Sequence, residues 1–213
     1  MGSTPQARTR SRTDADRHGN VVPLRRLGTG QSLSPIRQAE AYWTAMGGPG
    51  AIPRRSDLDP RGLGNILDQT LLLERIAPGL ARVRLAGRVL HGLAGMDLRG
   101  MPMTALFDAR SRAGFSDVLR SVFDGPGSAH LSLAVGAARC GDRQSAGMAL
   151  LPLRDNAGAV SRALGVLVVD GDRDALPPCR LTITGTQITD LAARPEVDPS
   201  RRRSLRLVAA RPD

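Results

Sequence analysis

The residues that most often carry catalysis or bind metals are few in this chain and widely spaced. Its 213 residues include three histidines and two cysteines, Cys140 and Cys179. No Gly-x-Ser-x-Gly, His-Glu-x-x-His, Cys-x-x-Cys or Walker-type loop occurs, so no nucleophilic, zinc or nucleotide site is indicated. The sequence therefore predicts no catalytic residue and no metal ligand, and we expect a protein that is not an enzyme.

A dense charged group lies in residues 49–60, PGAIPRRSDLDP, where proline and glycine indicate turns. Its charged members are Arg54, Arg55, Asp57 and Asp59. One hypothesis is a docking turn for an anion or a partner, because arginine forks bind carboxylates and phosphates. The alternative, which we favour, is a local network in which the aspartates cap the next turn and pair with the arginines.

The chain is strongly basic, with a net charge of +10, and all of its basic residues are arginines. Residues 1–33 hold six of them against two aspartates and show no apolar period, which predicts a disordered tail. Residues 201–203 form a second basic cluster. The tails could contact nucleic-acid phosphates without specificity, but few aromatic residues are available to stack on bases. We therefore disfavour nucleic acid as a partner.

No apolar stretch is long enough for a membrane-spanning helix, and the N-terminus lacks the apolar region of a secretory signal. The two cysteines are far apart and lie outside metal or redox motifs, as is typical of a reducing compartment. These features predict a cytoplasmic protein.

Residues 34–48 are predicted to form an N-terminal helix. Ser34 and Pro35 are typical of a helix start, and Gly47–Gly48 of its end. Its apolar residues recur at helical spacing, at Ile36, Ala39, Trp43 and Met46. This face could pack on its own domain or on a second subunit.

The rest of the pattern predicts one antiparallel sheet with helices inserted after its second strand. Strands are expected at 69–76, 81–85, 130–135, 144–153 and 163–169, and an amphipathic helix at 112–124. Residues 181–189 could add a sixth strand or an extension. We thus expect an α+β fold: a five-stranded antiparallel sheet with inserted helices on one face, an N-terminal helix and disordered tails. The expected domain spans 34–172, followed by a C-terminal extension, 173–213, with a possible extra strand and a basic tail.

This order of elements is that of a PAS domain, and several segments resemble a family of short bacterial PAS-like proteins. Residues 52–60 are similar to its Arg-Arg-x-Asp-hydrophobic-Asp-Pro segment, which follows a Tyr-Trp helix as at Tyr42-Trp43. The other similar segments are residues 84–87 (RLAG), 93–100 (LAGMDLRG), 150–153 (LLPL) and 164–165 (LG). The resemblance covers residues 34–172 and implies a PAS fold, a regulatory role and frequent self-association.

PAS domains often hold a small molecule between helix and sheet, so the resemblance implies a speculative ligand pocket. Its candidate lining residues are Leu85, His91, Phe107, Phe115, Leu119, Leu133, Met148 and Val166. The same residues equally describe an ordinary core, which is the default interpretation. The sequence indicates no cofactor: helix 112–124 lacks a histidine for haem, and no Asn-Cys-Arg-Phe-like segment is present for flavin.

We therefore expect a non-catalytic PAS-like sensory or regulatory domain. It would act in bacterial signalling through ligand- or partner-dependent protein–protein interaction. No output domain is evident, so its partners would be itself, as a homodimer, and an unidentified signalling protein. The expected interface is the 36–46 helix with the open face of the sheet. The alternatives are a ligandless protein–protein adaptor and, less favoured, a basic nucleic-acid-binding protein.

Overall fold

The computed structural model describes residues 34–48, 50–137, 143–171 and 177–191, all within the unit Leu33–Asp213. The tails predicted to be disordered lie outside the described residues. The elements, in chain order, are α1 (Pro35–Gly47), η1 (Arg55–Asp57), η2 (Pro60–Gln69), β1 (Thr70–Ala77), β2 (Leu80–Ala86), α2 (Arg88–Ala94), η3 (Met103–Leu106), α3 (Ser111–Phe123), β3 (Gly127–Ala137), β4 (Arg143–Arg154), β5 (Val160–Val169) and β6 (Cys179–Asp190).

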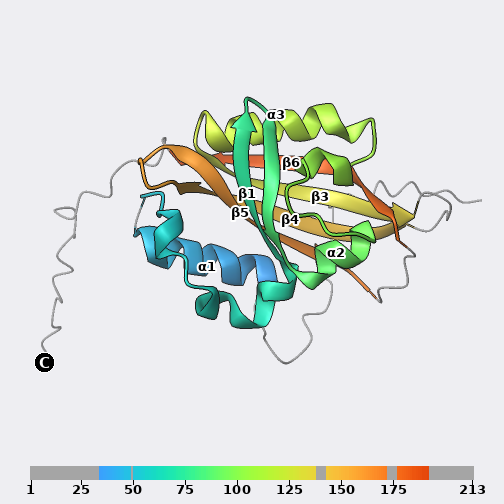
Figure 1. The fold of residues 1–213 in the computed structure, drawn as a ribbon, viewed down its shortest axis with the longest axis horizontal. Helices are drawn as coiled ribbons and strands as arrows, with labels where there is room; N and C mark the ends of the chain where they lie inside the picture. The colour runs from blue at the N-terminus through green and yellow to red at the C-terminus, as the bar shows by residue number, and fades with distance from the viewer. Residues whose placement is uncertain (1–33, 49, 138–142, 172–176, 192–213) are drawn as a thin grey trace, which may run out of the picture. The chain divides into compact units, whose positions relative to one another are not determined.

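The strands form one antiparallel sheet in the order β2-β1-β5-β4-β3-β6 (Figure 1). The predicted α+β fold is confirmed, but the predicted number of five strands is wrong, because the sheet has six. Strand β6 pairs with β3 along its length, from Gly127 opposite Asp190 to Ala137 opposite Cys179. This pairing satisfies backbone groups that an edge strand leaves open. The C-terminal extension thus contributes to the same sheet as residues 70–169.

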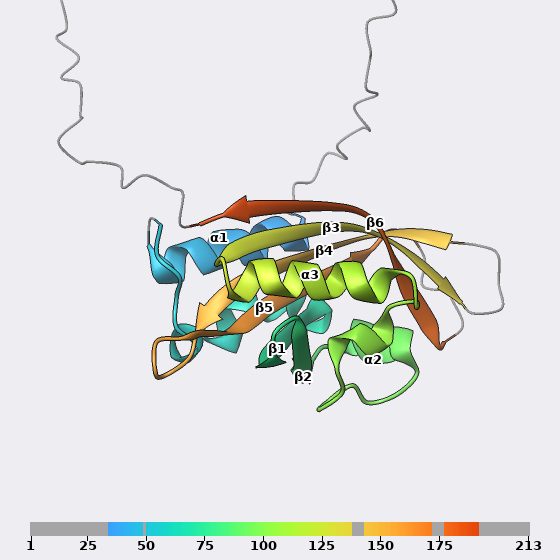
Figure 2. The same ribbon diagram turned by 90° about the horizontal axis from the view of Figure 1, so that it is seen from above.

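Helices cover both faces of the sheet, and the inserted helix α3 lies on one face as the sequence predicted. On the first face, α3 packs over a cluster that includes Phe107, Phe115 and Leu119. On the second face, α1 and η2 pack over a separate cluster that includes Trp43 and Ile66 (Figure 2). Strands β1, β4 and β5 each contribute apolar residues to both clusters, as expected of strands covered on both faces.

Two aromatic side chains hold α1 in place, Trp43 on the sheet and Tyr42 at the start of η2. The buried indole N–H of Trp43 donates to the carbonyl of Pro152 on β4, with an N–O distance of 2.7 Å. A proline is tolerated at this position because the pairing of β4 with β3 ends at Leu150. The missing N–H of Pro152 therefore costs no hydrogen bond to β3. The Tyr42 hydroxyl donates to the carbonyl of Asp59 at 2.9 Å and accepts from its N–H at 2.8 Å.

Candidate functional site

The charged turn folds into a local network. The Asp57 carboxylate accepts the backbone N–H of Arg54 at 3.0 Å, and the Asp59 carboxylate accepts that of Arg61 at 2.9 Å, which caps η2. The Arg54 guanidinium reaches the carbonyl of Asn156 at 3.4 Å. Arg55 has no ion pair within the described residues. This geometry favours the capping interpretation, and docking at the turn stays a prediction.

Five of the eight residues of the predicted pocket lie together on the first face, beneath and beside α3. They are Phe107, Phe115, Leu119, Leu133 and Met148. The rings of Phe107 and Phe115 are stacked with their centroids 4.1 Å apart, and both side chains are fully buried. The interior of the domain at this position is therefore filled by side chains.

The other three predicted pocket residues lie elsewhere. Val166 belongs to the cluster on the second face, because the alternation of β5 directs it away from α3. Leu85 pairs with Leu72 of β1, shares that second face and is 48% exposed. His91 lies on α2, where its Nε2 is 3.0 Å from the Ala86 carbonyl. These positions correct the predicted grouping.

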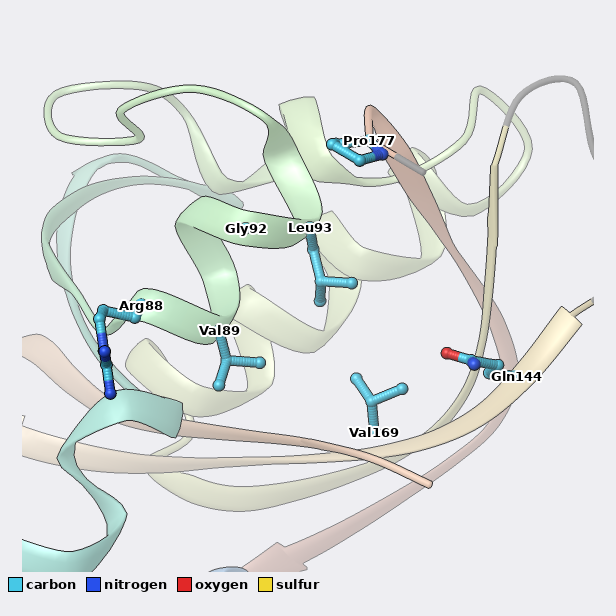
Figure 3. A pocket seen from close by; sticks show the side chains of 7 residues that line it. All are labelled: Arg88, Val89, Gly92, Leu93, Gln144, Val169 and Pro177. Atoms are coloured by element: carbon cyan, nitrogen blue, oxygen red, sulfur yellow. The ribbon is translucent and has the colours of Figure 1, made fainter. Parts of the chain in front are cut away.

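A cavity of 190 Å³ lies beside this core, beneath α2 (Figure 3). Val89 and Leu93 of α2 point toward Val169 of β5 across it. Its lining comprises Arg88, Val89, Gly92, Leu93, Gln144, Val169 and Pro177. This cavity was not predicted, although the apolar residues at i and i+4 of α2 indicate a buried helix face. The volume is below the roughly 300–1,000 Å³ of typical ligand pockets.

A second site that sequence reasoning missed is a charged cluster on the second face. Glu74 of β1 is nearly buried and forms ion pairs with Arg82 and Arg84 of β2 and with Arg162 of β5, at 2.5, 2.5 and 2.7 Å. Alternation had placed both β2 arginines on one face, and the only signal for their partner was a glutamate in an apolar strand, LLLERI. Burial by itself raises the pKa of Glu74, but the Arg82 and Arg84 hydrogen bonds and the Arg162 charge outweigh it and hold the pKa below its usual value.

This pKa shift predicts how stability depends on pH. A carboxyl group whose pKa is lower in the folded than in the unfolded chain stabilises the fold at pH values above its unfolded pKa. This contribution is lost as the pH falls through the folded pKa. We expect Glu74→Gln to lower the free energy of unfolding at pH 7 by ~1–3 kcal/mol, the cost of breaking a buried polar interaction. The deficit should shrink as the pH falls into the acid range. Urea unfolding of both proteins from pH 7 to pH 3 measures it, and a constant deficit would contradict the prediction.

Three further features of the described part of the chain concern metal ligands, thiols and membrane-spanning helices. No group of three or more potential metal ligands gathers among these residues. Burial raises the pKa of the Cys179 thiol, and Cys140 lies outside the described residues. No helix among the described elements has the length and apolar character to cross a membrane.

The fold and the sequence agree on the family. Residues 32–168 match the family model of the PAS domain, and the chain belongs to this family. The match confirms the resemblance stated from the sequence. No match was found among curated proteins.

Three solved structures of light-oxygen-voltage (LOV) proteins are similar to part of the chain. One is the light state of the blue-light photoreceptor Aureochrome1 LOV, with 16% identity, a TM-score of 0.36, and 53% of this chain and 88% of that chain covered. A LOV domain studied with a flavin analogue has 15% identity, a TM-score of 0.36, and coverages of 53% and 84%. An RNA-binding LOV receptor has 20% identity and a TM-score of 0.37, with 54% of this chain and 33% of that chain covered. These similarities assign no ligand to this chain.

Proposed function

We propose that this PAS domain is a non-catalytic regulatory module that transmits its signal by protein–protein contact. The observation that carries the proposal is the filled interior on the first face. Phe107 and Phe115 are stacked and fully buried there, and Met148 beside them is also fully buried. Because the core holds its own side chains, the proposal places recognition at the surface. This is the ligandless, adaptor-like form of PAS signalling.

Helix α1 is the element best suited to respond to a partner. Its buried side chains are Ala39 and Trp43, so the helix docks through few anchors. Glu40 adds an ion pair of 2.8 Å to His130 on β3, where both side chains are about one-third exposed. Helix α1 can be docked on the sheet or released from it. A partner that binds one of these two states more tightly would shift the population toward that state. Self-association through α1 belongs to this proposal, although the packing of α1 on its own sheet leaves less apolar surface for a second copy.

The core residues do not fit a flavin or a haem at the position between α3 and the sheet. A flavin ring system would have to replace the stacked pair of Phe107 and Phe115. The only cysteine of the described residues, Cys179, is buried on β6. His91 has one ring nitrogen 3.0 Å from the Ala86 carbonyl and the other 3.3 Å from the Leu98 N–H. We therefore propose that neither cofactor occupies this core.

A second candidate is a small-molecule sensor that uses the cavity beneath α2. The specific observation in its favour is that the apolar side chains of Val89, Leu93 and Val169 and the side chain of Gln144 line the same cavity (Figure 3). Such a lining combines apolar area with a polar group that could orient a ligand. At 190 Å³ the cavity fits a molecule far smaller than a flavin.

Native mass spectrometry with an absorbance scan separates these candidates. The full chain, purified from its own host, is expected to have the mass of its polypeptide or a multiple of it, without a visible absorption band. A stoichiometric extra mass would overturn the ligandless proposal. The variant Val169→Phe would then locate the ligand: loss of the extra mass would assign it to the cavity beneath α2, and retention would place it elsewhere.

A further inference from the structure

The second face of the sheet changes from apolar to charged along β1. Leu72 pairs with Leu85 of β2 and Leu164 of β5, and Leu72 and Leu164 belong to the cluster beneath α1 and η2. Two residues further along, Glu74 pairs with Arg82 and Arg162. Residues paired across antiparallel strands project to the same face. The leucine row is thus followed on this face by a charged row.

We propose that this charged end of the sheet docks an acidic segment of a partner protein. The arginine surface comprises Arg82, Arg84 and Arg162 around Glu74, with Leu85 beside them. This inference rests on the proposed function, because it requires that the domain acts by contact with another protein.

The charges of the arginine surface do not balance. Three guanidinium groups surround the Glu74 carboxylate. A second carboxylate, Asp155, acts on Arg162 through Ser161, which leaves a net charge of +1 by residue type. The side chains of Arg82, Arg84 and Arg162 are 38%, 48% and 25% exposed, whereas that of Glu74 is 10% exposed. The positive charge therefore reaches solvent while the negative charge of Glu74 does not. An acidic partner would meet a positive potential here.

The buried carboxylate also orients the guanidinium groups. Each guanidinium carries five N–H donors, and Glu74 accepts hydrogen bonds from Nε of Arg82 and Nη2 of Arg84. The Nε of Arg84 adds an ion-pair contact to the same carboxylate. Within the described part of the chain, no other hydrogen bond engages the remaining donors of these two arginines. Arginines already held in place lose less side-chain entropy when they bind a carboxylate.

Charge complementarity selects this occupant over others. A second copy of the chain would bring the same positive surface, and residues 1–33 carry six arginines against two acidic residues, so self-binding through them is disfavoured. The exposed Leu85 gives the surface an apolar contact that a protein segment can bury. The surface holds no aromatic residue on which a nucleic-acid base could stack.

The test uses the full-length protein and a fluorescein-labelled peptide of alternating glutamate and leucine. A matched peptide with glutamine in place of glutamate controls for apolar binding. We expect the acidic peptide to bind at low salt and the double variant Arg82→Gln/Arg84→Gln to weaken it by about tenfold or more, as loss of charge-assisted hydrogen bonds predicts. The control Arg110→Gln removes an exposed charge at the start of α3, on the other face, and should change affinity by less than about twofold.

Several outcomes would overturn the inference. The first is that the acidic peptide fails to bind the wild type, and the second is that the glutamine peptide binds as tightly as the acidic one. The third is that the double variant binds the acidic peptide as tightly as the wild type does. The double variant is also tested with single-stranded and duplex DNA. If it loses more affinity for DNA than for the acidic peptide, the surface binds nucleic acid. Far-UV circular dichroism of each variant confirms that it is folded. A ligand found by native mass spectrometry would overturn the ligandless proposal and leave this assay unaffected.

Discussion

Replacing Trp43 by alanine is expected to lower the free energy of unfolding by about 3–5 kcal/mol. The indole is 7% exposed within the cluster that joins α1 and η2 to the second face. Its removal deletes a large apolar group and leaves the buried carbonyl of Pro152 without its side-chain donor. Urea unfolding followed by far-UV circular dichroism measures the loss, because the variant lacks the single tryptophan needed for fluorescence.

The variant Trp43→Phe separates the two contributions. Phenylalanine keeps most of the apolar volume but cannot donate to Pro152, so a smaller loss of about 1–3 kcal/mol is expected. Tyr42→Phe removes the paired hydrogen bonds to Asp59 at an exposed site and should cost less than either. A loss below about 1 kcal/mol for Trp43→Ala would show that α1 does not dock on the sheet in solution, since such burial is worth several kcal/mol.

Replacing Phe115 by alanine is expected to produce a loss of similar size, about 3–5 kcal/mol, and a new binding property. The ring is fully buried and stacked on Phe107, so its removal opens an apolar cavity between α3 and the sheet. Apolar cavities of this kind stay dry and bind small apolar molecules such as benzene. Benzene should therefore raise the melting temperature of Phe115→Ala by mass action while leaving the wild type unchanged.

The control for this prediction is Phe115→Leu, which keeps most of the volume and should not respond to benzene. If benzene stabilised the wild type as much as Phe115→Ala, the native interior would already hold space for a ligand. That result would contradict the filled core and favour a sensor. A fully collapsed cavity would instead appear as a small loss of stability with no benzene effect, against the packing described here.

Periodic residues made much of the fold predictable. The apolar stripe from Phe115 to Phe123 predicted a helix at 112–124, which the structure places at Ser111–Phe123. Alternation at 81–85 and 130–135, and apolar runs at 144–153 and 163–169, predicted the strands within a few residues at each end. Helix η2 was missed, because Leu63 and Ile66 are spaced for a 3-10 helix within a segment of glycine and polar residues. The partner of residues 181–189 also could not be predicted, since their alternation identifies a strand but not its neighbour.

The sites were less predictable because they depend on register. Leu133 and Met148 lie where the predicted pocket placed them, on the first face. Val166 lies on the other face, and in an apolar strand such as β5 the residue types do not distinguish the two faces. Likewise, the shared face of Arg82 and Arg84 followed from alternation. Their common partner Glu74 required the pairing of β1 with β2, which a single sequence does not specify.

Strand β6 has a consequence for aggregation. The family match ends at residue 168, before this strand begins. A chain that ended at residue 168 would leave β3, which contains Leu131, Leu133 and Val135, as an unpaired edge strand. Such an edge can pair with a strand of another molecule. In the full sheet that place is taken by β6, whose last residues are exposed and polar apart from Ile188. We therefore expect the segment beyond the family boundary to protect this edge of the sheet from pairing with neighbouring molecules.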